Sequence, residues 1–72
     1  MSEKFNKKIY KNIEFYINKS GFNQRDLAKL MGIAESTLSG KLSRLNNGKG
    51  ITTTTLLEIS KALKVSPADL LK

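Results

Sequence analysis

The chain of 72 residues contains no cysteine and no histidine. Disulfides, thiolate zinc sites and imidazole general bases are therefore excluded. No apolar run approaches the roughly 18 residues of a membrane span, and the basic N-terminus lacks the apolar stretch of a signal peptide. A chain this short buries only about 60% of its unfolded surface, which leaves no room for an enzyme cleft. We expect a non-enzymatic cytoplasmic domain that uses no metal, cofactor, membrane or small-molecule substrate.

The charge balance is basic, with thirteen Lys or Arg against six Asp or Glu and a net charge of +7. The excess is +3 in residues 1–20, +2 in residues 21–45 and +2 in residues 46–72, so it is spread along the chain. A basic surface concentrates polyanions, and nucleic acid is the commonest partner of that kind. The same charge also keeps a small protein in solution, so composition favours a nucleic-acid partner without establishing one.

The spacing of apolar residues predicts an all-α fold, a single compact domain of five short helices without strands or internal repeats. The expected helices cover about residues 3–19, 24–31, 35–44, 53–63 and 67–71.

The first predicted helix is amphipathic. Ser2 and Gly21 have the chemistry of its N-cap and of its left-handed end. Phe15 falls among lysines, where we expect it either to be half-covered by the last helix or to contact a protein partner. The apolar stripe comprises Phe5, Ile9, Ile13, Tyr16 and Ile17, and the opposite face carries Lys4, Lys8, Lys11 and Lys19.

A turn joins the second and third predicted helices. Asn23 is a good N-cap for the second helix, and Gly32 is a good stop. Leu38 and Leu42, spaced four apart, anchor the third helix, and residues 46–50, NNGKG, have the composition of a loop. The expected apolar face of the second helix is Leu27, Ala28, Leu30 and Met31.

The fourth predicted helix starts in a run of threonines. Thr55 and Glu58 have capping-box spacing, and Thr52 is an alternative cap one turn earlier.

The last predicted helix has a complete start signal. Ser66 is its cap, with Pro67 at the first helical position and Asp69 completing the box. Leu70 and Leu71 are expected to point inward.

The spacing around LMGIAES indicates a helix-turn-helix. This motif needs a small residue where two helices meet at a steep angle, here Gly32, and another where the second helix crosses the first, here Ala28. It also needs apolar anchor residues on both helices, and all of these are present at spacings consistent with one another. The anchors are Leu27, Met31, Ile33, Leu38 and Leu42.

The segments NQRDLAKLMGIAESTLSGKLSR and LLEISKALKVSPADLL resemble the Cro and phage-repressor helix-turn-helix family, also called the XRE family. The resemblance runs from residue 5 to residue 71, and the second segment is similar to the family's frequent ending LLxLAKALGVSPxxL. In length and layout the chain resembles small temperate-phage Cro-type regulators and the antirepressor, or modulator-of-repression, proteins of such phages. The resemblance implies a five-helix domain of the lambda-repressor-like type with its helix-turn-helix at about residues 24–44.

The resemblance also implies that the third helix enters the DNA major groove with its N-terminal residues foremost. Gln24 matches the position that holds a phosphate at a helix N-terminus. The base-facing positions of relatives match Ala34, Glu35, Ser36, Ser39 and Gly40. The phosphate-binding positions match Asn23, Gln24, Lys41, Arg44 and Lys49.

The base-facing positions depart from what direct readout requires. Good readers are Arg or Lys for guanine and Asn or Gln for adenine, and none stands here. Glu35 accepts a hydrogen bond from a cytosine amine but also faces phosphates, and the hydroxyls of Ser36 and Ser39 bond almost any base. Gly40 offers no contact and lowers helix stability by about 0.5–1 kcal/mol relative to alanine. We expect an affinity based largely on phosphate contacts, with weak direct base readout.

Ile17 and Leu42 occupy positions where several relatives carry an Arg–Glu ion pair between the first and third helices. Two apolar residues there are expected to pack into the core, a replacement that is often neutral or stabilising. We therefore expect no role for them in the site.

Two functions remain open. The first is a phage-type transcriptional regulator of a genetic switch, binding double-stranded operator DNA as a homodimer with half-sites about 34–36 Å apart. The second is an antirepressor that binds a cognate phage repressor protein and blocks its DNA binding, because Glu35 suits a basic partner surface. Either function belongs in the cytoplasm of a bacterial host cell. Catalysis is disfavoured, since Asp26 and Glu35 are accompanied by no nucleophile–base pair or metal cluster.

Overall fold

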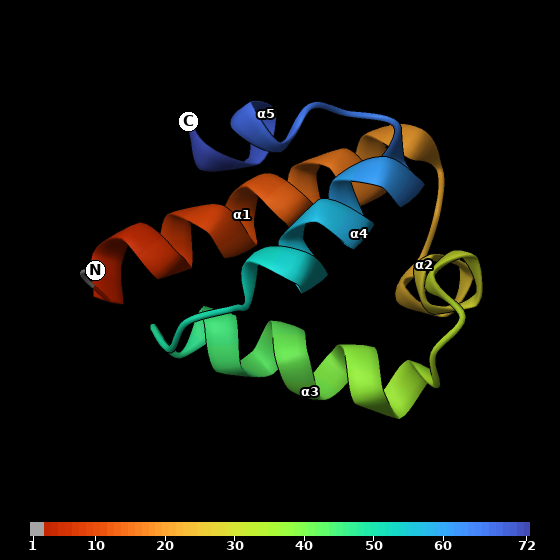
Figure 1. Ribbon diagram of the computed structural model, residues 1–72, viewed down its shortest axis with the longest axis horizontal. Helices are drawn as coiled ribbons and strands as arrows, with labels where there is room; N and C mark the ends of the chain where they lie inside the picture. Colours follow the sequence, from red (N-terminus) through yellow and green to blue (C-terminus); the bar gives the residue numbers. More distant parts are fainter. Residues whose placement is uncertain (1–2) are drawn as a thin grey trace.

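The computed structural model describes residues 3–72, which form five α-helices and no strand. α1 packs against α3, α4 and α5, while α2 packs against α3 and α4 (Figure 1). The all-α prediction is confirmed. No helix within residues 3–72 combines the length and the apolar character that crossing a bilayer requires. The helices are α1 (Glu3–Ser20), α2 (Gln24–Met31), α3 (Glu35–Asn46), α4 (Thr53–Leu63) and α5 (Pro67–Leu71).

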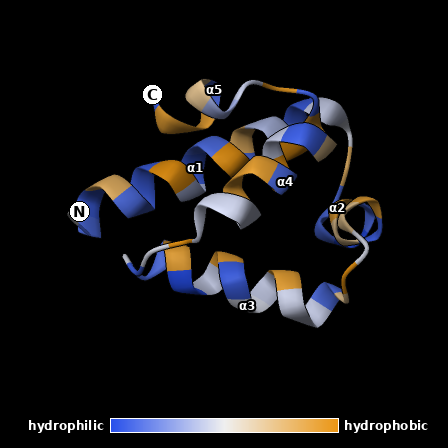
Figure 2. Ribbon diagram, in the orientation of Figure 1, coloured by the Kyte–Doolittle hydropathy of each residue, from blue (hydrophilic) through white to orange (hydrophobic). Residues whose placement is uncertain are grey.

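The core is built from one apolar face of each helix. Ile13 of α1, Leu27 of α2, Leu42 of α3 and Ile59 of α4 are each exposed by 1% or less. Figure 2 shows the hydrophobic residues of α3 turned toward the other helices, with polar residues facing outward. Ile17 is buried in the same cluster as Leu42, so the prediction that these two residues are core residues is confirmed.

α1 and α3 extend beyond their predicted ends at residues 19 and 44. α1 reaches Ser20, whose hydroxyl donates to a carbonyl of the last turn at 2.9 Å, and Gly21 then turns left-handed with φ 80°. α3 reaches Asn46, a residue predicted to lie in the loop, because the fully buried Leu45 holds the last turn against the core. The chain leaves α3 through Gly48, which has φ 85°.

The caps of α2 and α5 form as predicted. The Asn23 side chain accepts a hydrogen bond from the Asp26 N–H at 2.8 Å, and the Asp26 carboxylate accepts one from the Asn23 N–H at 3.2 Å. Gly32 ends α2 with φ 71°. Ser66 and Asp69 form the corresponding capping box at the start of α5. Side-chain chemistry alone was sufficient to locate these helix ends.

The start of α4 corrects the prediction of a capping box at Thr55. Thr52, the alternative, is the N-cap: its Oγ1 accepts a hydrogen bond from the Thr55 N–H at 3.2 Å and donates one to Thr55 Oγ1 at 2.8 Å. Thr55 therefore lies buried inside the helix and forms no box with Glu58. Consecutive threonines offer equivalent caps, and burial of Thr55 selects the earlier one. For α1, the predicted cap Ser2 lies outside the described residues.

Two leucines predicted to be covered, Leu71 and Leu30, are exposed. Leu71 is 40% exposed, because adjacent helix positions point about 100° apart and the preceding leucine takes the buried side. Leu30 is 57% exposed at the rim of a groove between α2 and α4. Phe15 is also 57% exposed. Its ring packs edge-on against Tyr16, with centroids 5.1 Å apart, and lies 5.8 Å from Lys19 Nζ.

Candidate nucleic-acid interface

α2, the turn after it and α3 form the helix-turn-helix. Gly32 adopts the left-handed conformation that reverses the chain, and the Ile33 N–H donates to the Ala28 carbonyl at 3.0 Å. Ala28 is buried where the two helices meet, so its small side chain permits their close approach. The turn predicted from LMGIAES is the turn observed.

α3 presents small side chains to solvent. Its inner face is buried through Leu38, Leu42 and Leu45. All five residues predicted to face bases are exposed, from the N-cap Ala34 onward. Ser43, which was not predicted as a site residue, follows Ser39 and Gly40 at a spacing of four and three residues and lies on the same exposed side of α3. The exposed line comprises Ser36, Ser39, Gly40 and Ser43.

This face suits close contact better than base recognition. Hydroxymethyl and hydrogen side chains leave the α3 backbone accessible to a surface that approaches it. The serine hydroxyls are single hydrogen-bonding groups that pair with any base, whereas discrimination by bidentate pairing requires Arg, Lys, Asn or Gln. The exposed line of α3 therefore allows insertion into a groove without specifying the sequence in it.

Glu35 is not a free carboxylate. Its Oε1 lies 3.6 Å from Nε of Arg25 in α2, and both side chains are more than half exposed. An exposed ion pair of this kind contributes about 0.2–1 kcal/mol. Glu35 also stands in the first turn of α3, whose N-cap Ala34 makes no side-chain hydrogen bond. The negative charge of Glu35 interacts favourably with the positive end of the helix dipole there. The role of Arg25 was missed, because the pair depends on how α2 crosses α3.

The predicted phosphate-binding residues Lys41, Arg44 and Lys49 are gathered at the end of α3 and the loop after it. Lys41 and Arg44 line a groove of about 180 Å³ with residues 50–52. The Lys49 N–H donates to the Arg44 carbonyl at 2.9 Å, which holds the loop against the helix. Lys41 and Arg44 therefore form one basic edge of α3, with Lys49 in the loop that follows the helix.

Asn23 and Gln24 lie apart from this basic edge, at the start of α2. The first N–H groups of a helix have no intrahelical acceptor and carry the positive end of its dipole. Asn23 uses its side-chain oxygen in the capping box, which leaves its amide NH₂ available to an anion. The Arg25–Glu35 pair ties this turn of α2 to α3.

The two groups flank α3 on opposite sides. Glu35 and Arg44 are nine residues apart, or 2.5 turns, so their side chains leave the helix about 180° apart. The start of α2 therefore lies along one edge of α3, and Lys41, Arg44 and the loop lie along the other. The exposed line of α3 therefore lies between these two edges.

The carboxylates considered for catalysis have structural partners. Asp26 is engaged in the capping box with Asn23, and Glu35 pairs with Arg25. Within residues 3–72, no three His, Cys, Asp or Glu side chains come together where they are able to hold a metal ion.

Gly40 is expected to be a site of stabilisation. It lies within α3, and a β-carbon built on it meets no atom within 4 Å. Gly40→Ala should raise the free energy of unfolding by about 0.5–1 kcal/mol, because alanine loses less backbone entropy in a helix. Urea unfolding followed by circular dichroism measures the change. The matched Gly32→Ala variant should be destabilised, since its φ is 71°. A destabilised Gly40→Ala protein would contradict an unstrained position.

Comparison with known proteins agrees with the helix-turn-helix fold. A model of the Cro/C1-type HTH DNA-binding domain matches residues 12–72. The fold is similar to the crystal structure of the clp gene regulator ClgR from C. glutamicum, with a TM-score of 0.73 and 25% sequence identity over 93% of this chain and 83% of that chain. No curated protein matches the chain significantly.

Proposed function

The chain belongs to the family of Cro/C1-type HTH DNA-binding domains, and from that premise we propose that it regulates transcription by holding α3 in the major groove of operator DNA. Two copies occupy half-sites about one helical turn, 34–36 Å, apart. The resemblance to Cro and phage repressors supports a place in a phage genetic switch, within the cytoplasm of a bacterial host. The protein is a non-enzymatic regulator in this proposal.

The observation that carries the proposal is the outward face of α3 between two phosphate-binding edges. Small side chains on this face permit insertion into the groove. The α2 start, through Asn23 and Gln24, meets one backbone, while Lys41, Arg44 and Lys49 meet the other. Phosphate contacts supply most of the affinity, and DNA shape with water-mediated contacts supplies modest specificity.

The test is a salt series with the purified protein. Its affinity for the promoter region of its own operon is compared with its affinity for a random duplex of equal length. We expect tighter binding to the promoter, with log affinity falling linearly as log salt concentration rises. Equal binding to both duplexes would contradict an operator-specific regulator, and absence of binding to either would contradict a DNA-binding role.

Glu35 is expected to weaken DNA binding, because its carboxylate repels phosphates and occupies Arg25. Glu35→Gln should allow one additional phosphate contact, which steepens the slope of log affinity against log salt concentration by about 0.9. Glu35→Lys should strengthen nonspecific binding further. Fluorescence anisotropy with a random duplex measures both variants. Glu58→Gln, at an exposed position of α4, makes the same charge change as a control. Equal effects of the Gln variants at the two positions would show a response to net charge and contradict a local role for Glu35.

The second candidate is an antirepressor that binds a cognate phage repressor through the same face. The lack of base-reading side chains on the exposed line of α3 favours it, since hydroxyls and glycine also permit close protein packing. The Arg25–Glu35 pair reduces the acidic character that this face offers to a basic partner. Adding the repressor to the salt series separates the candidates: a tight protein complex, with no preference for promoter DNA by the protein alone, favours the antirepressor. Glu35→Lys should then weaken that complex.

A further inference from the structure

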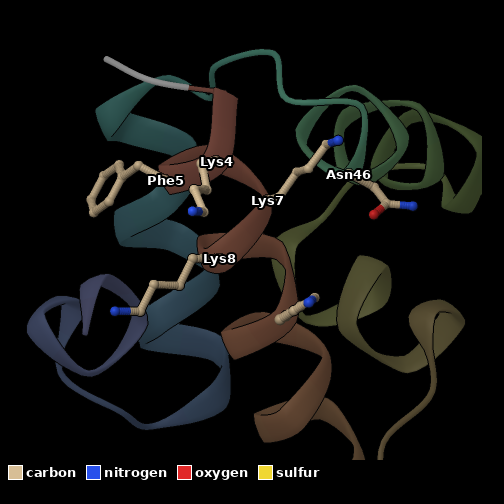
Figure 3. A pocket seen from close by; sticks show the side chains of 6 residues that line it. Lys4, Phe5, Lys7, Lys8 and Asn46 are labelled. Atoms are coloured by element: carbon tan, nitrogen blue, oxygen red, sulfur yellow. The ribbon is translucent and has the colours of Figure 1, made fainter.

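The N-terminal half of α1 carries a second basic surface. It is formed by four exposed lysines on the side of the helix that faces away from the buried isoleucines, within about 100° of one another. Together with Phe5 and Asn46 these lysines line an open groove of about 560 Å³. Figure 3 shows Lys7 extending toward Asn46, the last residue of α3, while Lys8 leaves the other side of α1. We call Lys4, Lys7, Lys8 and Lys11 the lysine surface.

The lysine surface is unfavourable for α1 itself. Lys4 lies three and four residues from Lys7 and Lys8, and Lys7 and Lys8 lie four and three residues from Lys11, so like charges meet at the spacings that bring helix side chains together. Lys4 also stands in the first turn of the helix, where the dipole disfavours positive charge. A bound anion relieves both effects.

The neighbouring carboxylates leave most of this charge uncompensated. Glu3 pairs with Lys7 at 3.6 Å, and Glu14 accepts a hydrogen bond from the Tyr10 hydroxyl at 2.9 Å. That hydrogen bond raises the pKa of Tyr10 above its ordinary value, because it favours the protonated hydroxyl. Lys4, Lys8 and Lys11 make no ion pair within 4.0 Å to any residue of the described chain. Their ammonium groups are therefore accessible to an external anion.

The lysine surface continues one edge of α3. Glu35 and Asn46 are eleven residues apart, which returns to nearly the same side of the helix after about 16 Å. Glu35 forms an ion pair with Arg25 at the start of α2, and Asn46 lines the groove of the lysine surface. The start of α2 and the lysine surface therefore line the same edge, opposite Lys41 and Arg44.

We propose that the lysine surface binds the sugar–phosphate backbone of the same duplex whose major groove holds α3. This inference rests on the proposed function and extends the protein's contact along one strand, from the start of α2 past the end of α3. The partner is a row of regularly spaced phosphates, because several flexible ammonium groups spread along a helix match a repeated point charge and read no base.

The test compares two double variants of equal net charge, both at exposed lysines. Lys4→Ala/Lys11→Ala removes the first and last lysines of the lysine surface, neither of which makes an ion pair within residues 3–72. Lys19→Ala/Lys61→Ala removes charges from the far end of α1 and from α4. Affinity for a fluorescein-labelled random duplex of about 30 base pairs is measured between about 50 and 200 mM salt. Circular dichroism checks the fold, and a Lys4→Gln/Lys11→Gln protein repeats the test with a different side chain.

For the Lys4/Lys11 variants, we expect the slope of log affinity against log salt concentration to be smaller in magnitude by about 1.8 than that of wild type. Between 50 and 200 mM salt, the affinity of wild type should therefore fall by about twelvefold more than that of the variants. The control should keep the wild-type slope. A wild-type slope in the Lys4/Lys11 variants would overturn the inference and leave the proposed function intact, and equal losses in both pairs would overturn it as a net-charge effect. Variants that lose binding to poly-glutamate but not to duplex would assign the surface to an acidic polypeptide and overturn it too. Failure of wild type to bind any duplex would overturn both proposals.

Discussion

Replacing Lys41 and Arg44 together with alanine is expected to lower affinity for duplex DNA by about a hundredfold at low salt. Both side chains line the basic edge of α3 beside the loop. A hydrogen bond to a charged group contributes about 1.5 kcal/mol at the lower end of its range, so two such bonds amount to about two powers of ten. The magnitude of the salt slope should also fall by about 1.8. Anisotropy titration of promoter and random duplexes measures both quantities.

The effect should be nearly uniform across sequences, because phosphate contacts carry no base information. The Lys19→Ala/Lys61→Ala protein is the control for net charge, and circular dichroism shows whether each variant is folded. A Lys41/Arg44 variant that binds both duplexes like wild type would show that this edge does not meet DNA. A loss confined to the promoter duplex would instead assign these residues to base readout.

Leu42→Ala is expected to lower the free energy of unfolding by about 2–5 kcal/mol, since truncating a buried leucine removes its burial and leaves a cavity. Leu42 is 1% exposed and stands where α3 joins the core. At about 0.05–0.15 kcal/mol per residue, the whole domain is stable by about 4–11 kcal/mol, so this change removes a large part of the total. Urea unfolding followed by circular dichroism measures the loss.

Leu57→Ala is the matched control, because Leu57 is 48% exposed on α4. Its effect should stay within about 1 kcal/mol, as for most surface substitutions. Leu42→Ala should also weaken DNA binding at temperatures where the variant is partly unfolded, since α3 is held in place by this residue. Equal stability of the two leucine variants would contradict the packing of α3 described here.

The parts of the fold that depend on local chemistry were predictable from the sequence. Asn23 and Ser66 cap their helices through their own side chains, and Gly32 supplies a left-handed turn that few other residues adopt. Thr52 and Thr55 are chemically equivalent, so burial in the folded core had to choose between them. The exposure of the Leu71 side chain was not predictable, because it depends on how much of a five-residue helix the core covers.

In the candidate site too, features set by local sequence were predictable, whereas contacts between helices were not. The exposure of Ser36 and Ser39 followed from the helical period once the leucines of α3 were assigned to the core. The Arg25–Glu35 pair did not follow, because it joins two helices whose crossing angle is a tertiary property. The groove lined by both Lys7 and Asn46 likewise brings together residues far apart in sequence, and the predicted end of α3 had placed Asn46 outside the helix.

The outward face of α3 and its two edges are expected to contact DNA. The most direct measurement is a titration of ¹⁵N-labelled protein with an operator-containing duplex, followed by amide chemical shifts. We expect the largest shifts at the start of α2, along the exposed line of α3 and at Lys49, with small shifts in α5. Shifts confined to α5 and the C-terminal end of α4, with the amides of α3 unchanged, would contradict it.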